Sequence, residues 1–170
     1  MQTRRKAAGI VAAVGLAAGT LLAAAPAQAS EDARAAGSAE RAGAARVQTA
    51  PPAPVGARAD AGAMASSPQV SPSAERIRYV SSGNDYTCSY GRLCTRVWDP
   101  VAGKWKVFDL YVCRTYSLSY WNGYGGYVNN QTTGTKAYFY NSSGGVIKTS
   151  TALNTSTSYN WTPVWKIKNC

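Results

Sequence analysis

The aromatic residues of this chain are confined to its second half, and this distribution limits where a folded core can form. All 5 Trp, 11 Tyr and 2 Phe residues lie between Tyr79 and Trp165. Residues 30–75 contain 15 Ala and 5 Pro but no aromatic residue. Such a segment buries too little apolar surface to offset the entropy lost on folding. We therefore expect one domain over residues 76–170. Residues 30–75 should form a disordered Ala- and Pro-rich leader or linker, whether propeptide, spacer or plain tail.

The first 29 residues have the organisation of an export signal. Arg4-Arg5-Lys6 forms a basic start, residues 7–25 are uncharged and rich in Ala, Leu and Val, and Ala27-Gln28-Ala29 is an A-x-A cleavage signal. An uncleaved membrane anchor is the alternative, but the many Ala and Gly make the stretch only weakly apolar. We predict a signal peptide over 1–29 and a secreted, extracellular protein, in which disulfides persist.

The second half consists of short candidate strands separated by turn residues. The predicted strands are Leu93–Trp98, Lys104–Val112, Lys136–Tyr140, Val146–Thr149 and Val164–Lys168. The predicted turns are Asp99-Pro100, Asn122-Gly123, Gly125-Gly126 and Gly144-Gly145. Alternation places Ala137 with Phe139 on one face of their strand, and Trp165 with Ile167 on one face of theirs. Many short strands with frequent turns predict an antiparallel sandwich or Greek-key fold.

A weak internal repeat refines this prediction. Trp98 is followed five residues later by Gly103, and the same scheme returns 42 residues on with Tyr140 and Gly145. An aromatic ring packed over a tight hairpin needs a glycine, because the turn calls for positive φ and close backbone approach. Two units of about 40 residues would each form one four-stranded Greek key.

These features together resemble the βγ-crystallin fold, and in detail its secreted bacterial branch of small metalloproteinase inhibitors. The resemblance covers residues 83–170 and is most specific in the run W-N-x6-N-N-Q-T. The residues that carry it are Cys88, Cys94, Trp98, Gly103, Cys113, Trp121, Asn122, Asn129, Asn130, Tyr140 and Gly145. It implies an all-β, βγ-crystallin-like double Greek-key sandwich. It also implies a peptidase inhibitor directed at extracellular metalloproteases.

Four cysteines allow three disulfide connectivities. The Gly-containing loop between Cys88 and Cys94 can close, which leaves Cys113 and Cys170. The resemblance favours these two pairs, because related inhibitors close a similar small loop. A metal or redox role is the alternative, but the chain has no C-x-x-C spacing and no His.

The resemblance also bears on calcium, which crystallin-type domains often bind through an Asn/Asp pair followed by hydroxyl side chains. The equivalent stretch Asn122–Tyr127 lacks the second acid and both hydroxyls, and Asn129–Thr133 has no carboxylate. Calcium takes about six to eight oxygen ligands, usually with carboxylates among them. We expect no strong calcium site, no other metal and no cofactor.

Composition argues against catalysis. Without His the chain has no Ser-His-Asp or Cys-His pair. A glycosidase needs two carboxylates in a cleft, and residues 76–170 offer only Asp85, Asp99 and Asp109. We expect a protein that is not an enzyme.

Two binding functions remain. A disulfide-tied β scaffold can present a loop to a protease cleft, and the candidate loops are 84–92, 99–104 and 154–162. Alternatively, the protein binds carbohydrate or an anionic cell-wall polymer, as an antimicrobial-type envelope protein. The net charge of +8 over residues 76–170 and a run of five rings favour this. The run comprises Tyr116, Tyr120, Trp121, Tyr124 and Tyr127, of which we expect at least half in the core. We expect a monomer and no nucleic-acid partner.

Overall fold

A computed structural model describes residues 43–57 and 65–170, and their regular elements are twelve β-strands. The predicted export signal, residues 30–42 and residues 58–64 lie outside the described residues. The strands are β1 (Arg46–Thr49), β2 (Gln69–Ser71), β3 (Arg76–Val80), β4 (Asp85–Cys88), β5 (Arg92–Asp99), β6 (Lys104–Leu110), β7 (Thr115–Ser119), β8 (Tyr124–Asn130), β9 (Lys136–Tyr140), β10 (Val146–Thr151), β11 (Thr155–Asn160) and β12 (Lys166–Lys168). Within this part of the chain, no helix is long and apolar enough to cross a membrane.

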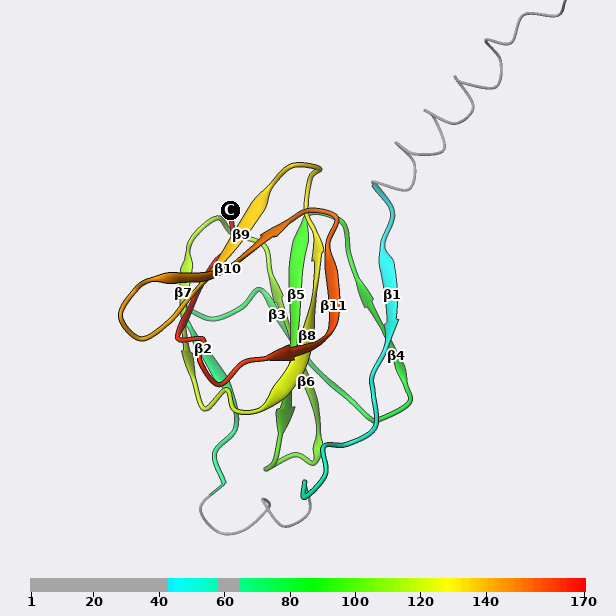
Figure 1. The fold of residues 1–170 in the computed structure, drawn as a ribbon. Coiled ribbons are helices and arrows are strands. Elements are labelled where there is room, and N and C mark those ends of the chain that lie inside the picture. Colours follow the sequence, from blue (N-terminus) through cyan, green and yellow to red (C-terminus); the bar gives the residue numbers. More distant parts are fainter. Residues whose placement is uncertain (1–42, 58–64) are drawn as a thin grey trace, which may run out of the picture.

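The strands form two five-stranded sheets and a two-stranded one, and every paired strand is antiparallel (Figure 1). The first large sheet has the order β10-β9-β12-β7-β2 and the second the order β11-β8-β5-β6-β3. The small sheet pairs β1 with β4. The predicted all-β, antiparallel class is therefore confirmed. The five predicted strands correspond to β5, β6, β9, β10 and β12 and are correct to within two residues at each end.

The two large sheets exchange strands. Strands β5–β8 form one consecutive set of four, and β9–β12 form another. Each large sheet contains the first, second and fourth strands of one set together with the third strand of the other. β11 pairs with β8, and β7 pairs with β12. Neither set can complete its sheet without the other, so we expect both sets to unfold together.

The main core lies between the two large sheets. It contains Phe108 and Leu93 from one sheet and Phe139 and Ile167 from the other, all inaccessible to solvent. Trp161 lies among them, with its ring centroid 5.3 Å from that of Phe139. Ala137 and Phe139 of β9 are both buried, as their alternation predicts. Close packing of large rings supplies much of the buried area that a small domain needs.

The predicted pairing of Trp165 with Ile167 on one face is wrong. Ile167 is buried, whereas Trp165 is 56% exposed and Val164 is buried in its place. The alternation fails because β12 begins only at Lys166, so Trp165 belongs to the irregular segment before the strand.

Gly125 and Gly126 do not form the predicted turn, because both lie inside β8. A Cβ atom on Gly125 would come within 2.5 Å of the indole Nε1 of Trp161, and closer still to the carbonyl oxygen of Arg96. A Cβ atom on Gly126 would lie 2.6 Å from the carbonyl oxygen of Ser156. At these two glycines, neighbouring groups approach the backbone of β8 too closely for a side chain. A Gly-Gly pair in the sequence does not distinguish such a site within a strand from a turn.

The predicted start of the folded domain at residue 76 is also wrong. β1 pairs with β4 and β2 pairs with β7, so residues 46–49 and 69–71 belong to the fold. The backbone of this segment accepts two indole N–H groups: Trp105 donates to Pro51 O and Trp121 donates to Gln69 O, both at 2.8 Å. The segment contributes backbone acceptors and small or polar side chains, and so it needs no aromatic side chain of its own.

Glu75 fastens this segment to the sandwich. Its carboxylate accepts the N–H groups of Tyr111 and Val112 and the hydroxyl of Tyr116. Burial opposes ionisation, but these hydrogen bonds outweigh it and hold the pKa of Glu75 below its ordinary value of 4.5.

We therefore predict an acid-sensitive contribution from Glu75. A carboxyl group whose folded pKa is lowered contributes stability above its unfolded pKa, and that contribution disappears as the pH falls through the folded value. Glu75→Gln should cost about 1 kcal/mol at pH 7 and less at pH 3, because one charge-assisted network is lost. Urea unfolding at both pH values measures this, with the exposed Asp85→Asn variant as the control. An equal cost for Glu75→Gln at both pH values would contradict the assignment.

Both disulfides pair as the resemblance implies: Cys88 with Cys94 and Cys113 with Cys170. The first joins β4 to β5 inside a second core, beneath the small sheet, that also contains Trp105 and Val107. The second ties the last residue to the connection between β6 and β7. Two disulfides fit an oxidising environment.

The two disulfides should differ in their effect on stability. They close loops with sequence separations of 6 and 57 residues. A cross-link that closes a longer loop restricts the unfolded chain more, by about 2 and about 4 kcal/mol here on the loop-entropy relation. We expect the Cys113→Ser/Cys170→Ser variant to lose roughly twice the free energy of unfolding lost by the Cys88→Ser/Cys94→Ser variant. Urea unfolding of the two variants side by side checks this; equal losses would contradict it.

Candidate binding surface

The run of five rings between residues 116 and 127 divides into core and surface. Tyr116, Trp121 and Tyr127 are buried, which confirms that at least half of the run belongs to the core. Tyr120 and Tyr124 are 57% and 63% exposed. Trp121 is fixed by its indole hydrogen bond to the β2 backbone and by edge-to-face packing on Trp161.

Two adjoining hollows carry the exposed rings. The larger, of about 740 Å³, is lined by Pro54, Val55, Ala65, Ser66, Trp98, Pro100, Tyr120, Asn122, Gly123 and Tyr124. The smaller, of about 390 Å³, is lined by Leu118, Ser119, Tyr120, Trp121, Asn122, Thr162, Val164 and Trp165. They share Tyr120 and Asn122 and therefore adjoin. We call the surface formed by Trp98, Tyr120, Asn122, Tyr124 and Trp165 the aromatic groove.

The loop that carries the groove is held in one conformation. Tyr120 has a φ of 63°, in the left-handed region that non-glycine residues seldom adopt. Gly123 donates its N–H to the Thr162 hydroxyl at 2.9 Å and accepts the N–H of Trp161 at 2.8 Å. A residue in this region persists where its surroundings fix it, so Tyr120 projects from a defined position.

The β5–β6 hairpin lies beside the groove, since Pro100 lines the larger hollow. The Asp99 carboxylate accepts the N–H groups of Val101 at 2.9 Å and Ala102 at 3.1 Å. Asp99 itself is buried, receives a hydrogen bond from the Ser67 hydroxyl and lies 3.8 Å from the Lys106 ammonium. The tip is therefore rigid, and it presents Val101 with 62% of its surface exposed.

The internal repeat is clearest at the residue that follows each of its two aromatic residues, Trp98 and Tyr140. Asn141 takes the place of Asp99, and its side-chain oxygen accepts the N–H groups of Ser143 and Gly145 at 3.1 and 2.8 Å. Gly103 has the expected positive φ of 60°. The expectation for Gly145 is wrong, because the positive φ falls on Gly144 instead. In the second hairpin the glycine with positive φ comes four residues after the aromatic residue, not five. The five-residue spacing from aromatic to glycine, which both units share in the sequence, does not show this difference.

The other two predicted loops are largely strand. Residues 84–92 include β4, which pairs with β1. β1 lies in residues 30–75, which the sequence predicted to be outside the folded domain. Residues 154–162 include β11, which pairs with β8. Of the three candidates, only residues 99–104 form an exposed hairpin tip.

The residues of the family motif lie in different parts of the structure. Trp98 and Tyr140 are half-buried at the ends of β5 and β9, Trp121 is buried, and Asn122 is exposed in the groove. Gly103 and Gly145 lie exposed in the two hairpins. The motif therefore places Trp98 and Asn122 in the groove and the other residues outside it.

Asn129 and Asn130 act inside the fold. Asn129 is buried and donates to Ser150 O at 2.7 Å. Asn130 is buried and donates to Cys88 O at 3.0 Å and Ala44 O at 2.9 Å, while it accepts from Arg46 Nε at 3.1 Å. The N-N-Q-T run thus connects the N-terminal segment to β8. The part of the family motif formed by Asn129 and Asn130 therefore has a structural role inside the fold.

The remaining acidic groups are engaged separately. Asp99 holds the hairpin, Asp109 pairs with Arg76 and Arg78, and Asp85 accepts a hydrogen bond from Thr49 at 2.6 Å. Over residues 43–57 and 65–170, no three His, Cys, Asp or Glu side chains gather where they could hold a metal ion. The groove and hairpin offer rings, amides, hydroxyls and an aliphatic tip, which are groups for binding.

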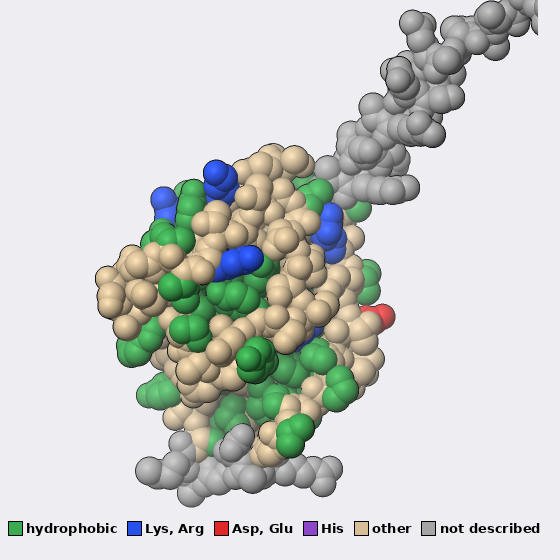
Figure 2. All heavy atoms as spheres, viewed as in Figure 1, with side chains coloured by type: hydrophobic (Ala, Val, Ile, Leu, Met, Phe, Trp, Pro, Cys, Tyr) green, Lys and Arg blue, Asp and Glu red, His purple; other side chains and the backbone are tan. Residues whose placement is uncertain are grey.

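Figure 2 shows hydrophobic side chains gathered over the lower half of the face in view, while most Lys and Arg side chains in view lie above them. The aromatic groove presents the exposed rings of Tyr120, Tyr124 and Trp165, and such rings are typical of a surface that meets a partner. Comparisons with protein-family models, with curated proteins and with solved structures found no match to this chain.

Proposed function

We propose that this protein is a secreted peptidase inhibitor with a βγ-crystallin-like double Greek-key fold, and that the β5–β6 hairpin enters the cleft of an extracellular metalloprotease. The exchange of β7 and β11 between the two sheets supports the fold, because each four-strand set then depends on the other as paired Greek keys do. The two disulfides support an extracellular setting.

One observation carries the inhibitory function: a rigid hairpin that projects an exposed aliphatic side chain. Asp99 fixes the backbone of Val101 and Ala102 before any partner binds, so little conformational entropy is lost on binding. Val101 suits an apolar pocket of a protease cleft. The exposed rings of the neighbouring groove can extend the contact, because Tyr and Trp are enriched at the centres of protein interfaces.

A second function is favoured by the groove itself. Tyr120, Tyr124 and Trp165 present exposed rings around the amide of Asn122 and the hydroxyl of Thr162. Rings that stack on sugar faces, with amides and hydroxyls beside them, suit a carbohydrate chain of the cell envelope. In this alternative the hairpin would be only a wall of the site.

Matched substitutions separate the two functions. We expect Val101→Lys to weaken inhibition of a thermolysin-like protease by about a hundredfold, because the tip would carry a charge into an apolar pocket. Val146→Lys is the control, since Val146 is 52% exposed and lies at the second hairpin. Inhibition constants of both variants are the measurement. Equal inhibition by the two variants would contradict the hairpin as the inhibitory element.

The same proteins should be tested for retention on purified cell-wall polysaccharide. Tyr124→Ala should reduce retention if the groove binds sugars, because stacking on a ring is lost. Tyr111→Ala is the control, since Tyr111 is 58% exposed and lies outside the groove. Retention that depends on Tyr124, without inhibition of any protease, would replace the inhibitor proposal by the carbohydrate one.

A further inference from the structure

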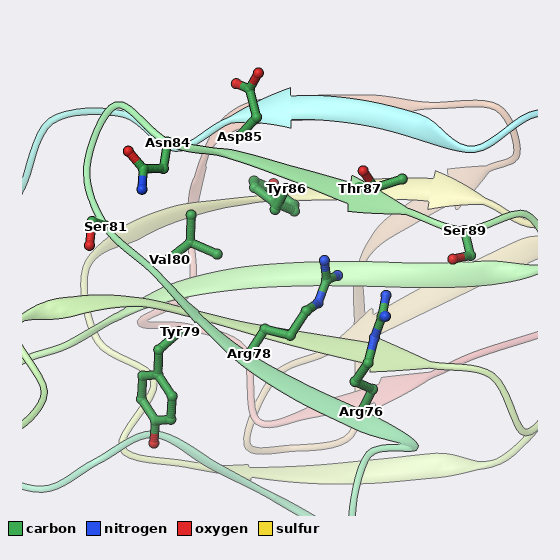
Figure 3. Close-up of a pocket in the computed structure, with 10 residues that line it drawn as sticks. All are labelled: Arg76, Arg78, Tyr79, Val80, Ser81, Asn84, Asp85, Tyr86, Thr87 and Ser89. Carbon is green, nitrogen blue, oxygen red and sulfur yellow. The ribbon is translucent and has the colours of Figure 1, made fainter.

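A separate cleft of about 770 Å³ lies between β3 and β4 (Figure 3). Only four residues join these strands, yet among the described residues β3 pairs with β6 and β4 pairs with β1. They therefore diverge from their turn, and the cleft opens between them. None of its lining residues belongs to the aromatic groove or the β5–β6 hairpin.

Two guanidinium groups point into the cleft from β3. Arg76 and Arg78 share one face of the strand, and both pair with the fully buried carboxylate of Asp109. Arg76 Nη2 lies 2.7 Å from Oδ2, and Arg78 Nη2 lies 2.5 Å from Oδ1. Asp109 thus orients both groups, but it balances only one of their two charges.

The surroundings add positive charge. Arg78 and Arg96 lie near the same ring, each with Cζ 5.8 Å from the centroid of Tyr86. Arg96 is buried, and no carboxylate pairs with it in the part of the chain that the structure describes. Asp85 lines the cleft, but its carboxylate turns to the far side of β4, where Thr49 binds it. An anion in the cleft would therefore meet an excess of cations.

Hydrogen-bond donors remain available on both walls. Arg78 Nε is buried without a hydrogen-bond partner among the described residues. The Arg76 side chain is 49% exposed and uses only Nε and Nη2 on Asp109. Opposite them, Ser89, the residue after β4, brings a hydroxyl group. A buried donor without a partner is costly, so a ligand oxygen here would be favoured.

We propose that this cleft binds a phosphate group, with Arg76 and Arg78 on one side and the hydroxyl of Ser89 on the other. Arginine donates parallel hydrogen bonds that match phosphate oxygens. The oxygens of a phosphate point in several directions and can reach both walls at once. The two oxygens of a carboxylate lie in one plane and reach one wall. The site is independent of the proposed inhibitory hairpin.

Titration calorimetry of the purified protein with inorganic phosphate, at constant ionic strength, tests the site. We expect saturable binding that Arg76→Gln weakens by at least about tenfold, because charge-assisted hydrogen bonds are lost. Arg92→Gln is the matched control, since Arg92 lies over the Tyr111 ring and outside the cleft. Ser89→Ala should weaken binding by about fivefold and removes only a hydroxyl group, so it keeps the test valid if Arg76→Gln fails to fold.

The same titration with dimethyl phosphate distinguishes the source of the group. Affinity equal to that for inorganic phosphate indicates a phosphodiester in a polymer, and loss of affinity indicates the free ion; both results support the phosphate site. No saturable phosphate binding by the unsubstituted protein would overturn the proposal. Equal affinities of Arg76→Gln and Arg92→Gln, or acetate binding as tight as phosphate, would also overturn it.

Discussion

A fragment that begins at Arg76 should fail to fold, or should lose at least about 5 kcal/mol of its free energy of unfolding. It would lack β1 and β2, and with them the partners of three buried donors. Trp105 would lose Pro51 O, Trp121 would lose Gln69 O, and the Lys106 ammonium would lose Ser67 and Pro68. Each buried donor left unpaired costs about 1–3 kcal/mol, and a charged one more.

The control is a fragment that begins at Gly43, which keeps every contact described above. Urea unfolding followed by tryptophan fluorescence compares the two fragments, because Trp105 and Trp121 both contact the removed segment. The fragment from Gly43 should match the complete chain. Coincident cooperative transitions of the two fragments would show that residues 43–75 are not part of the folding unit.

Gly125→Ala should be the most damaging single methyl addition in the chain as described. The added Cβ would overlap the Arg96 carbonyl oxygen and the Trp161 indole, and one of these is backbone within the same sheet. The Trp161 indole also donates to that carbonyl at 2.8 Å, so both partners are fixed. We expect a loss of about 3 kcal/mol or more, as in overpacked cores.

Gly134→Ala provides the comparison. Gly134 has a φ of 88° and nothing within 4 Å of an added Cβ, so only the strain of a left-handed backbone applies. That strain costs about 1–2 kcal/mol. Thermal and urea unfolding of both variants give the two values. A smaller loss for Gly125→Ala than for Gly134→Ala would show that β8 moves to make room.

The strands that the sequence predicts are those stabilised by their own side chains. Residues of β5, β6 and β9 combine alternating apolar side chains with a turn at one end, and the structure has them at nearly the expected bounds. β1 and β2 carry no such signal. β1 forms a separate sheet with β4, β2 adds backbone to a sheet edge at β7, and the backbone oxygens of Pro51 and Gln69 accept indole hydrogen bonds. Only tertiary contacts with distant residues make them strands.

The binding surface could be predicted only in part for a similar reason. The sequence indicated the aromatic run and the hairpin at residues 99–104, but alternation did not separate exposed Tyr120 from buried Trp121 in an irregular loop. Trp165 was placed on one strand face with Ile167 because the start of β12 could not be located. The cleft between β3 and β4 was not expected, since its walls depend on the pairing of β4 with the N-terminal segment.

The measurement that tests the inhibitory function most directly is the titration of the protein into a thermolysin-like protease at 50 and 500 mM salt. This change shortens the Debye length from about 14 to about 4 Å and screens exposed charges. A rigid hairpin seated in a cleft through Val101 should inhibit stoichiometrically and keep most of its affinity, because shape and buried contacts set the dissociation rate. The absence of inhibition at micromolar protein, with salt-sensitive retention on cell wall, would contradict the account.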